Sequence, residues 1–161
     1  LASYALGIGM DVIAVDNLAC TVNIPVKLGN SQDVSVVIST ETDLKSILGK
    51  CDYISIHVPK QADGSAVIGA AEFALMKNGV RLANAARGGV FDEMALLAAL
   101  NSGKVAACAL DVYENEPNPN KELLSHPKIA CTPHIGAATM EAQDRIGAEL
   151  AELIINEFVV K

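Results

Sequence analysis

Several polar residues lie where predicted strands end, and their side chains are of types that do chemistry. The polar and turn residues at these positions are Asp16, the segment 57–59, Arg87, Asp111 and His134. A guanidinium offers rigid hydrogen-bond donors to carboxylate and carbonyl oxygens. An imidazole has a pKa near neutrality and can move protons. Because ligands of parallel α/β sheets bind outside the carboxyl ends of the strands, these residues are candidates for one site.

Strands that alternate with helices are predicted to position these residues. The predicted strands span 11–16, 52–59, 80–86, 105–112 and 128–133. The predicted helices span 42–50, 70–79, 91–104 and 139–158, and Thr40 or Thr42 is the expected N-cap of the first of them. This alternation favours βαβ units with right-handed crossovers. We therefore expect an α/β fold with a Rossmann-type doubly wound parallel sheet.

The composition argues against two classes of partner. The chain has 161 residues, with 12 Lys or Arg and 19 Asp or Glu, and a formal net charge of −7. An acidic chain without a basic cluster is not expected to bind nucleic acid or an anionic membrane surface. No apolar run approaches the roughly 18 residues that a membrane-spanning helix needs.

The cysteines indicate a reducing compartment. Cys20, Cys51, Cys108 and Cys131 are far apart in the sequence and form no C-x-x-C pair. We therefore expect four reduced thiols in a cytoplasmic protein, with no zinc site and no disulfide framework. The chain begins in mid-pattern, without an initiator Met or a signal peptide, so we expect it to be part of a longer protein.

The stretch "ALGIGMDVIAVD" (5–16) contains a G-x-G pair that resembles a dinucleotide-binding fingerprint. In that fingerprint a strand precedes G-x-G-x-x-G and a helix follows it. Here a helix-like segment precedes Gly7, and the third position of the pattern is Val12. Gly7 and Gly9 therefore fit better as the turn from a helix into a strand.

Asp16 keeps a functional interpretation in this stretch. An acid at the end of the second strand of a Rossmann unit accepts hydrogen bonds from the adenosine ribose and disfavours the 2′-phosphate of NADP. If Asp16 has that role, the first strand and most or all of the glycine-rich loop are expected upstream of this chain.

From residue 51 onward the chain resembles a known family. The segments that carry the resemblance are, in order, "CDYISIHVP", "LMKNGVRLANAARGGVFDEMALLAAL", "GKVAACALDVYENEP" and "TPHIGAATMEAQDRIGAE". They resemble the D-isomer-specific 2-hydroxyacid dehydrogenases, whereas residues 17–40 match that family least well. The resemblance implies an NAD-dependent oxidoreductase that interconverts a 2-hydroxy acid and a 2-keto acid.

The resemblance implies a catalytic set of Arg87, Glu116 and His134. Arg87 falls on the arginine of the family's A-R-G-G motif, Glu116 on the acid before the proline of D-V-x-x-x-E-P, and His134 on the histidine of P-H-I-G. Each residue alone also fits a solvated loop position, and His134 also fits a cap of the last helix region. The intact order of the three motifs favours the catalytic interpretation.

Reduction of a 2-keto acid explains why these residue types are needed. A guanidinium anchors the substrate carboxylate and polarises the carbonyl. An imidazolium donates a proton as the hydride arrives and regains it in the reverse reaction. A carboxylate beside the imidazole orients the ring and favours its charged form, while the cofactor carries the hydride.

The resemblance also implies which residues bind NAD. Apart from Asp16, Arg87 and His134, these residues are Val58, Pro59, Ala85, Ala86, Asp111, Ile135, Gly136 and Ala137. Asp111 resembles the acid that hydrogen-bonds the nicotinamide carboxamide. His57 is left open between a ligand contact and an ordinary strand-end residue, and His126 is expected in a surface loop.

Within the family, "TMEAQDRIGAE" (139–149) favours the members that interconvert 3-phosphoglycerate and 3-phosphohydroxypyruvate in serine biosynthesis. Glyoxylate/hydroxypyruvate reductases and D-lactate dehydrogenases share the same catalytic set and remain alternatives. NAD-sensing corepressors of the same superfamily are an alternative from another class, the interaction modules.

The same resemblance implies how the protein is organised. Residues 1–138 are expected to form the NAD-binding domain, with its first strand and glycine loop missing. Residues 139–161 are expected to form a helix that crosses towards a substrate domain outside this chain. A homodimer is expected by analogy, and the chain by itself is expected to be weakly active or inactive.

Overall fold

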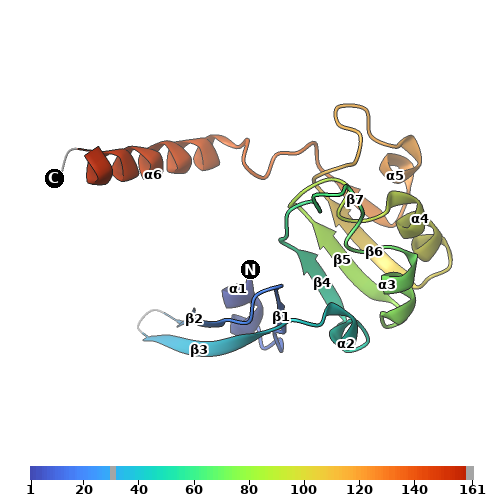
Figure 1. Cartoon of the computed structure of the whole chain (residues 1–161), viewed down its shortest axis with the longest axis horizontal. Coiled ribbons are helices and arrows are strands. Elements are labelled where there is room, and N and C mark those ends of the chain that lie inside the picture. The colour runs from blue at the N-terminus through green and yellow to red at the C-terminus, as the bar shows by residue number, and fades with distance from the viewer. Residues whose placement is uncertain (30–31, 159–161) are drawn as a thin grey trace. The chain divides into compact units, whose positions relative to one another are not determined.

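The structure is a computed structural model, and it describes residues 1–29 and 32–158. The chain divides into two compact units, Leu1–Lys50 and Cys51–Lys161. Each unit has its own β-sheet, as the ribbon in Figure 1 shows.

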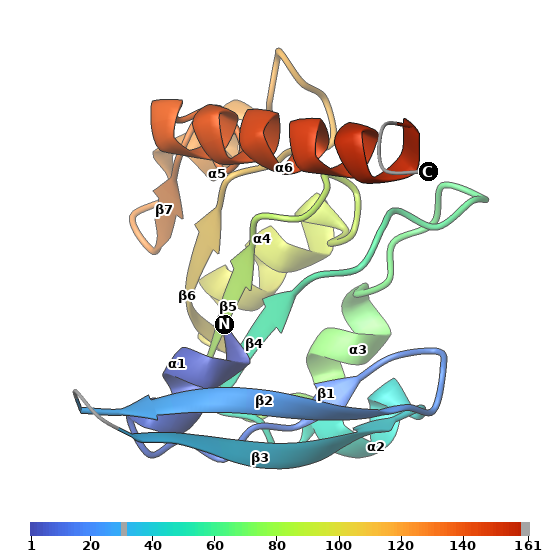
Figure 2. The ribbon, with the colours of Figure 1, turned by 90° about the vertical axis from the view of Figure 1, so that its left-hand side faces the viewer.

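The first unit is built on a small mixed sheet with the strand order β1-β3-β2. Its elements are α1 (Ala2–Gly7), β1 (Ala14–Val15), β2 (Thr21–Leu28), β3 (Gln32–Glu41) and α2 (Leu44–Leu48). β1 runs parallel to β3, whereas β2 and β3 run antiparallel and side by side (Figure 2). The predicted turn from helix to strand is confirmed, because α1 ends at Gly7 and Gly9 has a φ of +84°.

The hairpin of β2 and β3 is not predicted from the sequence. Its residue types explain why the segment is extended: β-branched side chains, which favour strands, are frequent in both halves. In β2 and β3 these residues are Thr21, Val22, Ile24, Val26, Val34, Val36, Val37, Ile38 and Thr40. Gly29, directly after β2, has a φ of +65°, a backbone conformation that glycine adopts without strain.

The second unit contains a parallel sheet with the strand order β4-β5-β6-β7. Its strands are β4 (Tyr53–Ile56), β5 (Val80–Asn84), β6 (Val105–Leu110) and β7 (Ile129–Cys131). The helices α3 (Ala70–Leu75), α4 (Glu93–Asn101) and α5 (Lys121–Ser125) connect consecutive strands, and α6 (Met140–Phe158) follows β7. The prediction of an α/β fold with a Rossmann-type parallel sheet is confirmed.

Aliphatic side chains from the strands and from α4 form the core of the second unit. Leu96 and Leu100 of α4 and Val105 of β6 have no exposed surface, and Leu82 of β5 is 4% exposed. Helix α4 packs against β6 and α3 packs against α4. This core fixes the strand ends from which the candidate site residues emerge.

Several predicted element boundaries are wrong in detail. Helix α2 begins after Asp43, whose side chain accepts a hydrogen bond from Lys45 N, so neither Thr40 nor Thr42 is the N-cap. Helix α3 ends at Leu75, before the predicted stop at Gly79. Short helix α5 is not predicted, and Asn120 caps it by accepting a hydrogen bond from Glu122 N.

The described residues include no helix long and apolar enough to cross a membrane. None of the four cysteines forms a disulfide: Cys20 and Cys131 are exposed, Cys51 is half-buried and Cys108 is buried. Burial, with the neighbouring Cys131, raises the pKa of the Cys108 thiol to about 12. The expected domain boundary at residue 138 stays a prediction.

Candidate functional site

The candidate site lies at the carboxyl ends of the strands of the second unit. Because β4 to β7 are parallel, the residues that follow them meet at one edge of the sheet. Arg87 lies three residues after β5, Asp111 directly follows β6, and His134 lies three residues after β7. Asp16, which directly follows β1, belongs to the first unit.

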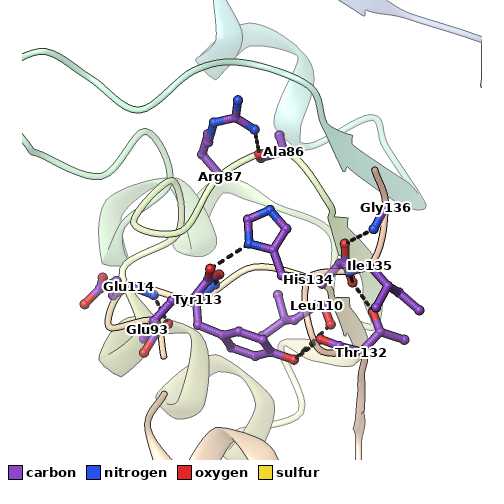
Figure 3. A network of polar contacts seen from close by, with 12 residues as sticks. Ala86, Arg87, Glu93, Leu110, Tyr113, Glu114, Thr132, His134, Ile135 and Gly136 are labelled. Carbon is purple, nitrogen blue, oxygen red and sulfur yellow. Dashed lines mark hydrogen bonds and ion pairs between the residues drawn. The ribbon is translucent and has the colours of Figure 1, made fainter. Parts of the chain in front are cut away.

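His134 and Glu116 form a hydrogen-bonded pair of side chains. Nδ1 of His134 lies 2.6 Å from Oε2 of Glu116, and Figure 3 shows the imidazole turned towards this contact. Oε1 of Glu116 accepts a hydrogen bond from Tyr113 N at 2.9 Å. The bond to His134, followed by the bond from Tyr113 N, holds the pKa of the Glu116 carboxyl below its usual value.

This arrangement orients the imidazole. An ionised carboxylate can only accept, so Nδ1 of His134 carries the hydrogen that it shares with Glu116. Nε2 is then the ring nitrogen that can exchange a proton with a ligand. The two side chains are 48% and 34% exposed, so a ligand can reach both.

The backbone of His134 has an unusual conformation that the neighbouring Asp111 supports. The φ of His134 is +56°, a left-handed value that few residues other than glycine adopt. Oδ1 of Asp111 accepts hydrogen bonds from the Thr132 hydroxyl and from Ile135 N, and Oδ2 accepts one from Gly136 N. The carboxylate therefore ties down the loop on both sides of His134.

Asp111 holds this loop best in its ionised form. Its residue is 7% exposed, and this burial by itself disfavours the charge. The hydrogen bonds from Thr132, Ile135 and Gly136 outweigh burial and hold the pKa of the Asp111 carboxyl below its usual value. Its stabilising contribution is therefore fully present above about pH 4 and is lost as the pH falls through the lower pKa of the folded state.

We expect Asp111→Asn to lower the melting temperature at pH 7, because an amide nitrogen would then face backbone N–H donors. The difference from the unmodified protein should narrow as the pH falls below about 4, where Asp111 itself becomes protonated. Thermal unfolding at several pH values measures this. Asp144→Asn makes the same change of charge on the exposed surface of α6 and is the control. Its free energy of unfolding should stay within about 0.5 kcal/mol of that of the unmodified protein. A difference for Asp111→Asn that does not depend on pH would contradict this account.

Tyr113 connects the end of β6 to the His134 loop. Its side chain is buried, and its hydroxyl lies 2.9 Å from Thr132 O and 3.1 Å from Leu110 O, so its hydrogen is shared between these two carbonyls. Burial, with the neighbouring Cys131, raises the pKa of the Tyr113 phenol. The phenol is therefore a neutral donor that fixes the spacing between these loops.

Arg87 lies on the neighbouring loop with an exposed side chain. Its Nη1 donates to Ala86 O at 2.6 Å, and Figure 3 shows the guanidinium turned towards this carbonyl and away from the imidazole of His134. Within the described residues it forms no ion pair with Glu116. Its charge is thus available to an anionic ligand.

Two close contacts hold the Arg87 loop against the loop that carries Glu116. A Cβ atom at Gly88 would lie 1.8 Å from Tyr113 O, so a residue with a side chain cannot sit there unless the backbone moves. Glu93, at the start of α4, is 8% exposed and accepts a hydrogen bond from Glu114 N at 2.8 Å. Burial raises the pKa of the Glu93 carboxyl, although this hydrogen bond opposes the shift.

The other sequence-predicted residues lie on the loops after β4, β5 and β7. Val58 and Ala86 are half-buried; Pro59, Ala85, Ile135, Gly136 and Ala137 are exposed. His57 Nε2 lies 2.9 Å from Ser55 Oγ. His126 is the C-cap of α5, and its Nδ1 accepts a hydrogen bond from Lys128 N.

Four residues of the site are not identified from the sequence: Asn84, Glu93, Tyr113 and Thr132. Each supports a loop through hydrogen bonds, as the contacts above and those of Asn84 below show. The sequence does carry a signal for Asn84, because the side chain of an Asn at a strand end often bonds the backbone two residues later. The sequence indicates only that Glu93 is an acid in the first turn of a helix, and it gives no sign of the hydrogen bond to Glu114 N.

Comparison with known proteins identifies relatives of this chain. Residues 1–136 match the family described as D-isomer specific 2-hydroxyacid dehydrogenase, NAD binding domain. D-3-phosphoglycerate dehydrogenase of Archaeoglobus fulgidus is 48% identical over 115 residues, which are 71% of this chain and 22% of that protein. Hydroxypyruvate reductase of Thermotoga maritima is 40% identical over 160 residues, 98% of this chain and 48% of that protein.

The fold is also similar to that of solved structures. A glyoxylate reductase from Paecilomyes thermophila is 40% identical, with a TM-score of 0.63 over 69% of this chain and 34% of that one. The chain therefore spans about half or less of the length of these relatives.

Proposed function

Since this chain belongs to the D-isomer-specific 2-hydroxyacid dehydrogenases, we propose that it forms the cofactor-binding part of an enzyme that interconverts 3-phosphoglycerate and 3-phosphohydroxypyruvate, a step of serine biosynthesis. The observation that most strongly supports a 2-hydroxyacid dehydrogenase reaction is the pairing of His134 with Glu116 at 2.6 Å, at the edge of an NAD-binding sheet. The similarity to D-3-phosphoglycerate dehydrogenases supports the phosphorylated substrate. Such a pair is suited to proton transfer at neutral pH.

In this proposal Arg87 binds the carboxylate of the 2-keto acid and polarises its carbonyl. The guanidinium is exposed, and within the described residues it forms no ion pair with Glu116. An anionic substrate can therefore bind Arg87 without breaking an ion pair between Arg87 and Glu116. A planar guanidinium offers two parallel donors, which fix the orientation of a carboxylate as well as binding it.

His134 is the proposed proton donor in reduction and proton acceptor in oxidation. Its Nδ1 is bonded to Glu116, so Nε2 gives a proton to the carbonyl oxygen as that oxygen becomes a hydroxyl. Glu116 holds the ring in place and balances the charge of the protonated imidazole. The left-handed backbone at His134, held through Asp111, sets the direction in which the ring points.

The residues at this edge fit a nicotinamide cofactor. Within the described residues, Oδ2 of Asp111 accepts one hydrogen bond, from Gly136 N, so it retains a lone pair for an N–H of a carboxamide. Ala85 and Ala137 are exposed and small, and they allow a flat ring to approach the backbone. When bound, the nicotinamide supplies the hydride in reduction and accepts it in oxidation.

Asp16 is the proposed determinant of the preference for NAD over NADP. Its side chain is exposed, and Oδ1 accepts a hydrogen bond from Leu18 N at 3.0 Å. Oδ2 makes no hydrogen bond within the described part of the chain, which suits the hydroxyls of a ribose. A 2′-phosphate would face a carboxylate of like charge.

Asp16→Ala should therefore lower the ratio of kcat/KM for NADH to that for NADPH by roughly tenfold, equivalent to about 1.4 kcal/mol. Steady-state kinetics with both cofactors measures the ratio. Asp11→Ala removes an exposed acid in the same unit and should leave the ratio unchanged. An unchanged ratio in Asp16→Ala would mean that Asp16 does not read the ribose.

Two substrates compete within the proposal. The similarity to D-3-phosphoglycerate dehydrogenases supports the phosphorylated substrate, whereas the similarity to hydroxypyruvate and glyoxylate reductases supports an unphosphorylated one.

By analogy with the family, we further propose a homodimer in the cytoplasm. Sedimentation of the full-length protein would measure its oligomeric state.

The oxidation of NADH, followed by absorbance, tests the proposed function in the full-length protein. The panel of substrates is 3-phosphohydroxypyruvate, hydroxypyruvate, glyoxylate and pyruvate. We expect the highest kcat/KM with 3-phosphohydroxypyruvate. A preference for hydroxypyruvate or glyoxylate would assign the protein to the reductases. Binding of NADH without turnover of any substrate would contradict the proposal and favour the interaction class.

A further inference from the structure

Asn84 is a buried polar residue at the end of β5, and in the described part of the chain both hydrogen bonds of its side chain go to the Arg87 loop. It is 3% exposed. Its Oδ1 accepts a hydrogen bond from Ala86 N at 3.0 Å, and its Nδ2 donates one to Arg87 O at 2.9 Å. The amide therefore uses one acceptor and one donor on two consecutive residues of that loop.

These bonds constrain the backbone from which the Arg87 side chain extends. Asn84 O also accepts a hydrogen bond from Asp111 N at 3.0 Å, which ties Asn84 to the end of β6. On the other side of Arg87, the backbone of Gly88 is packed so closely that a Cβ atom there would lie 1.8 Å from Tyr113 O. The backbone of Arg87 is thus held before and after the residue, while its guanidinium remains exposed.

We propose that Asn84 is a positioning residue, which sets the place of the Arg87 guanidinium for the carboxylate of the substrate. This inference rests on the proposed function of Arg87. It requires the amide and not merely a buried polar group: an aspartate would keep the acceptor for Ala86 N, but would put a second acceptor against Arg87 O. The donor half of the amide can therefore be removed with little change of shape.

Asn84→Asp in the full-length protein tests the inference through kinetics with the preferred 2-keto acid. Since a displacement of about 1 Å can cost roughly 100-fold, we expect kcat/KM for the keto acid to fall by about 10- to 100-fold. Asn84→Ser, which also lacks a donor that reaches Arg87 O, should act in the same direction and serves if the first variant does not fold. Asn78→Asp makes the same chemical change at an exposed position and should leave kcat/KM unchanged.

A double-mutant cycle separates positioning from a general loss of stability. If Asn84 acts through Arg87, the Asn84 substitution should change kcat/KM by less than about twofold when Arg87→Ala is already present. A purely structural role would lower kcat/KM by the same factor in both backgrounds, and that result would overturn the inference. Full activity of both Asn84 variants would overturn it as well.

The activity of the unmodified protein distinguishes a failure of the proposed function from a failure of the inference about Asn84. If it turns over no 2-keto acid, the proposed function fails, and the role of Asn84 fails with it. If it is active and the Asn84 substitutions have the same effect with and without Arg87, the inference about Asn84 alone is contradicted.

Discussion

His134→Asn is expected to lower kcat by about 10²- to 10⁴-fold in the full-length protein, the range typical of a lost general acid–base group. The amide of Asn cannot give up and regain a proton at neutral pH, so reduction would lose its proton donor. Steady-state kinetics with the preferred 2-keto acid measures kcat, and fluorescence titration with NADH measures cofactor binding. We expect the affinity for NADH to stay nearly unchanged.

Asn suits this test because of the backbone at position 134. His134 has a φ of +56°, and Asn adopts this left-handed region more readily than most residues. The substitution therefore removes the imidazole without forcing the loop out of shape. An equal loss of NADH affinity and of kcat would mean that the loop had moved, and an unchanged kcat would remove His134 from the mechanism.

His126→Asn is the matched control for this experiment. His126 is the C-cap of α5, and its Nε2 lies 3.3 Å from Asn101 Oδ1. It takes no part in the proposed site, so the same chemical change there should leave kcat and the affinity for NADH unchanged.

Among substitutions that add a single methyl group at the site, Gly88→Ala is expected to destabilise the protein most. The added Cβ would lie 1.8 Å from Tyr113 O and 2.3 Å from Tyr113 C, and both are backbone atoms that cannot rotate away. Forced overpacking of this kind costs about 1–3 kcal/mol or more. For a chain of this size that corresponds to a fall of roughly 3–10 °C in melting temperature. Thermal unfolding measures it.

The same substitution should also lower activity, because it pushes the Arg87 loop away from the loop that carries Glu116. Gly147→Ala is the matched control: a Cβ at Gly147 meets no atom within 4 Å, and α6 surrounds it with helix. In a helix this change is neutral or stabilises by up to about 1 kcal/mol. Equal melting temperatures for Gly88→Ala and the unmodified protein would show that the loops are not packed as described.

Helices and strands are predicted best where the spacing of hydrophobic residues agrees with the residues that begin or end an element. The strands β5 and β6 and helix α4 lie within the predicted segments, because buried aliphatic runs and an acid-rich first turn are local signals. The hairpin of β2 and β3 is missed, since residues 17–40 lie outside the motifs that guided the prediction. Its β-branched residues are nevertheless a local signal for strands.

For the candidate site, the sequence predicts which residues follow the strands but not what holds them. The 2.6 Å contact between Glu116 and His134 agrees with the expected pairing of carboxylate and imidazole. The supporting bonds of Asp111, Asn84 and Glu93 depend on loop geometry that the order of residues does not reveal. The roles of the predicted residues stay predictions until variants are measured.

The transfer of deuterium tests the central claim most directly. The full-length protein is incubated with NADH that carries deuterium at both C4 positions and with the preferred 2-keto acid, and the product is analysed by NMR and chiral chromatography. Hydride transfer at this site predicts a D-2-hydroxy acid with deuterium on C2. A product without deuterium on C2, a product of the L configuration, or recovery of the unreduced keto acid would contradict the account.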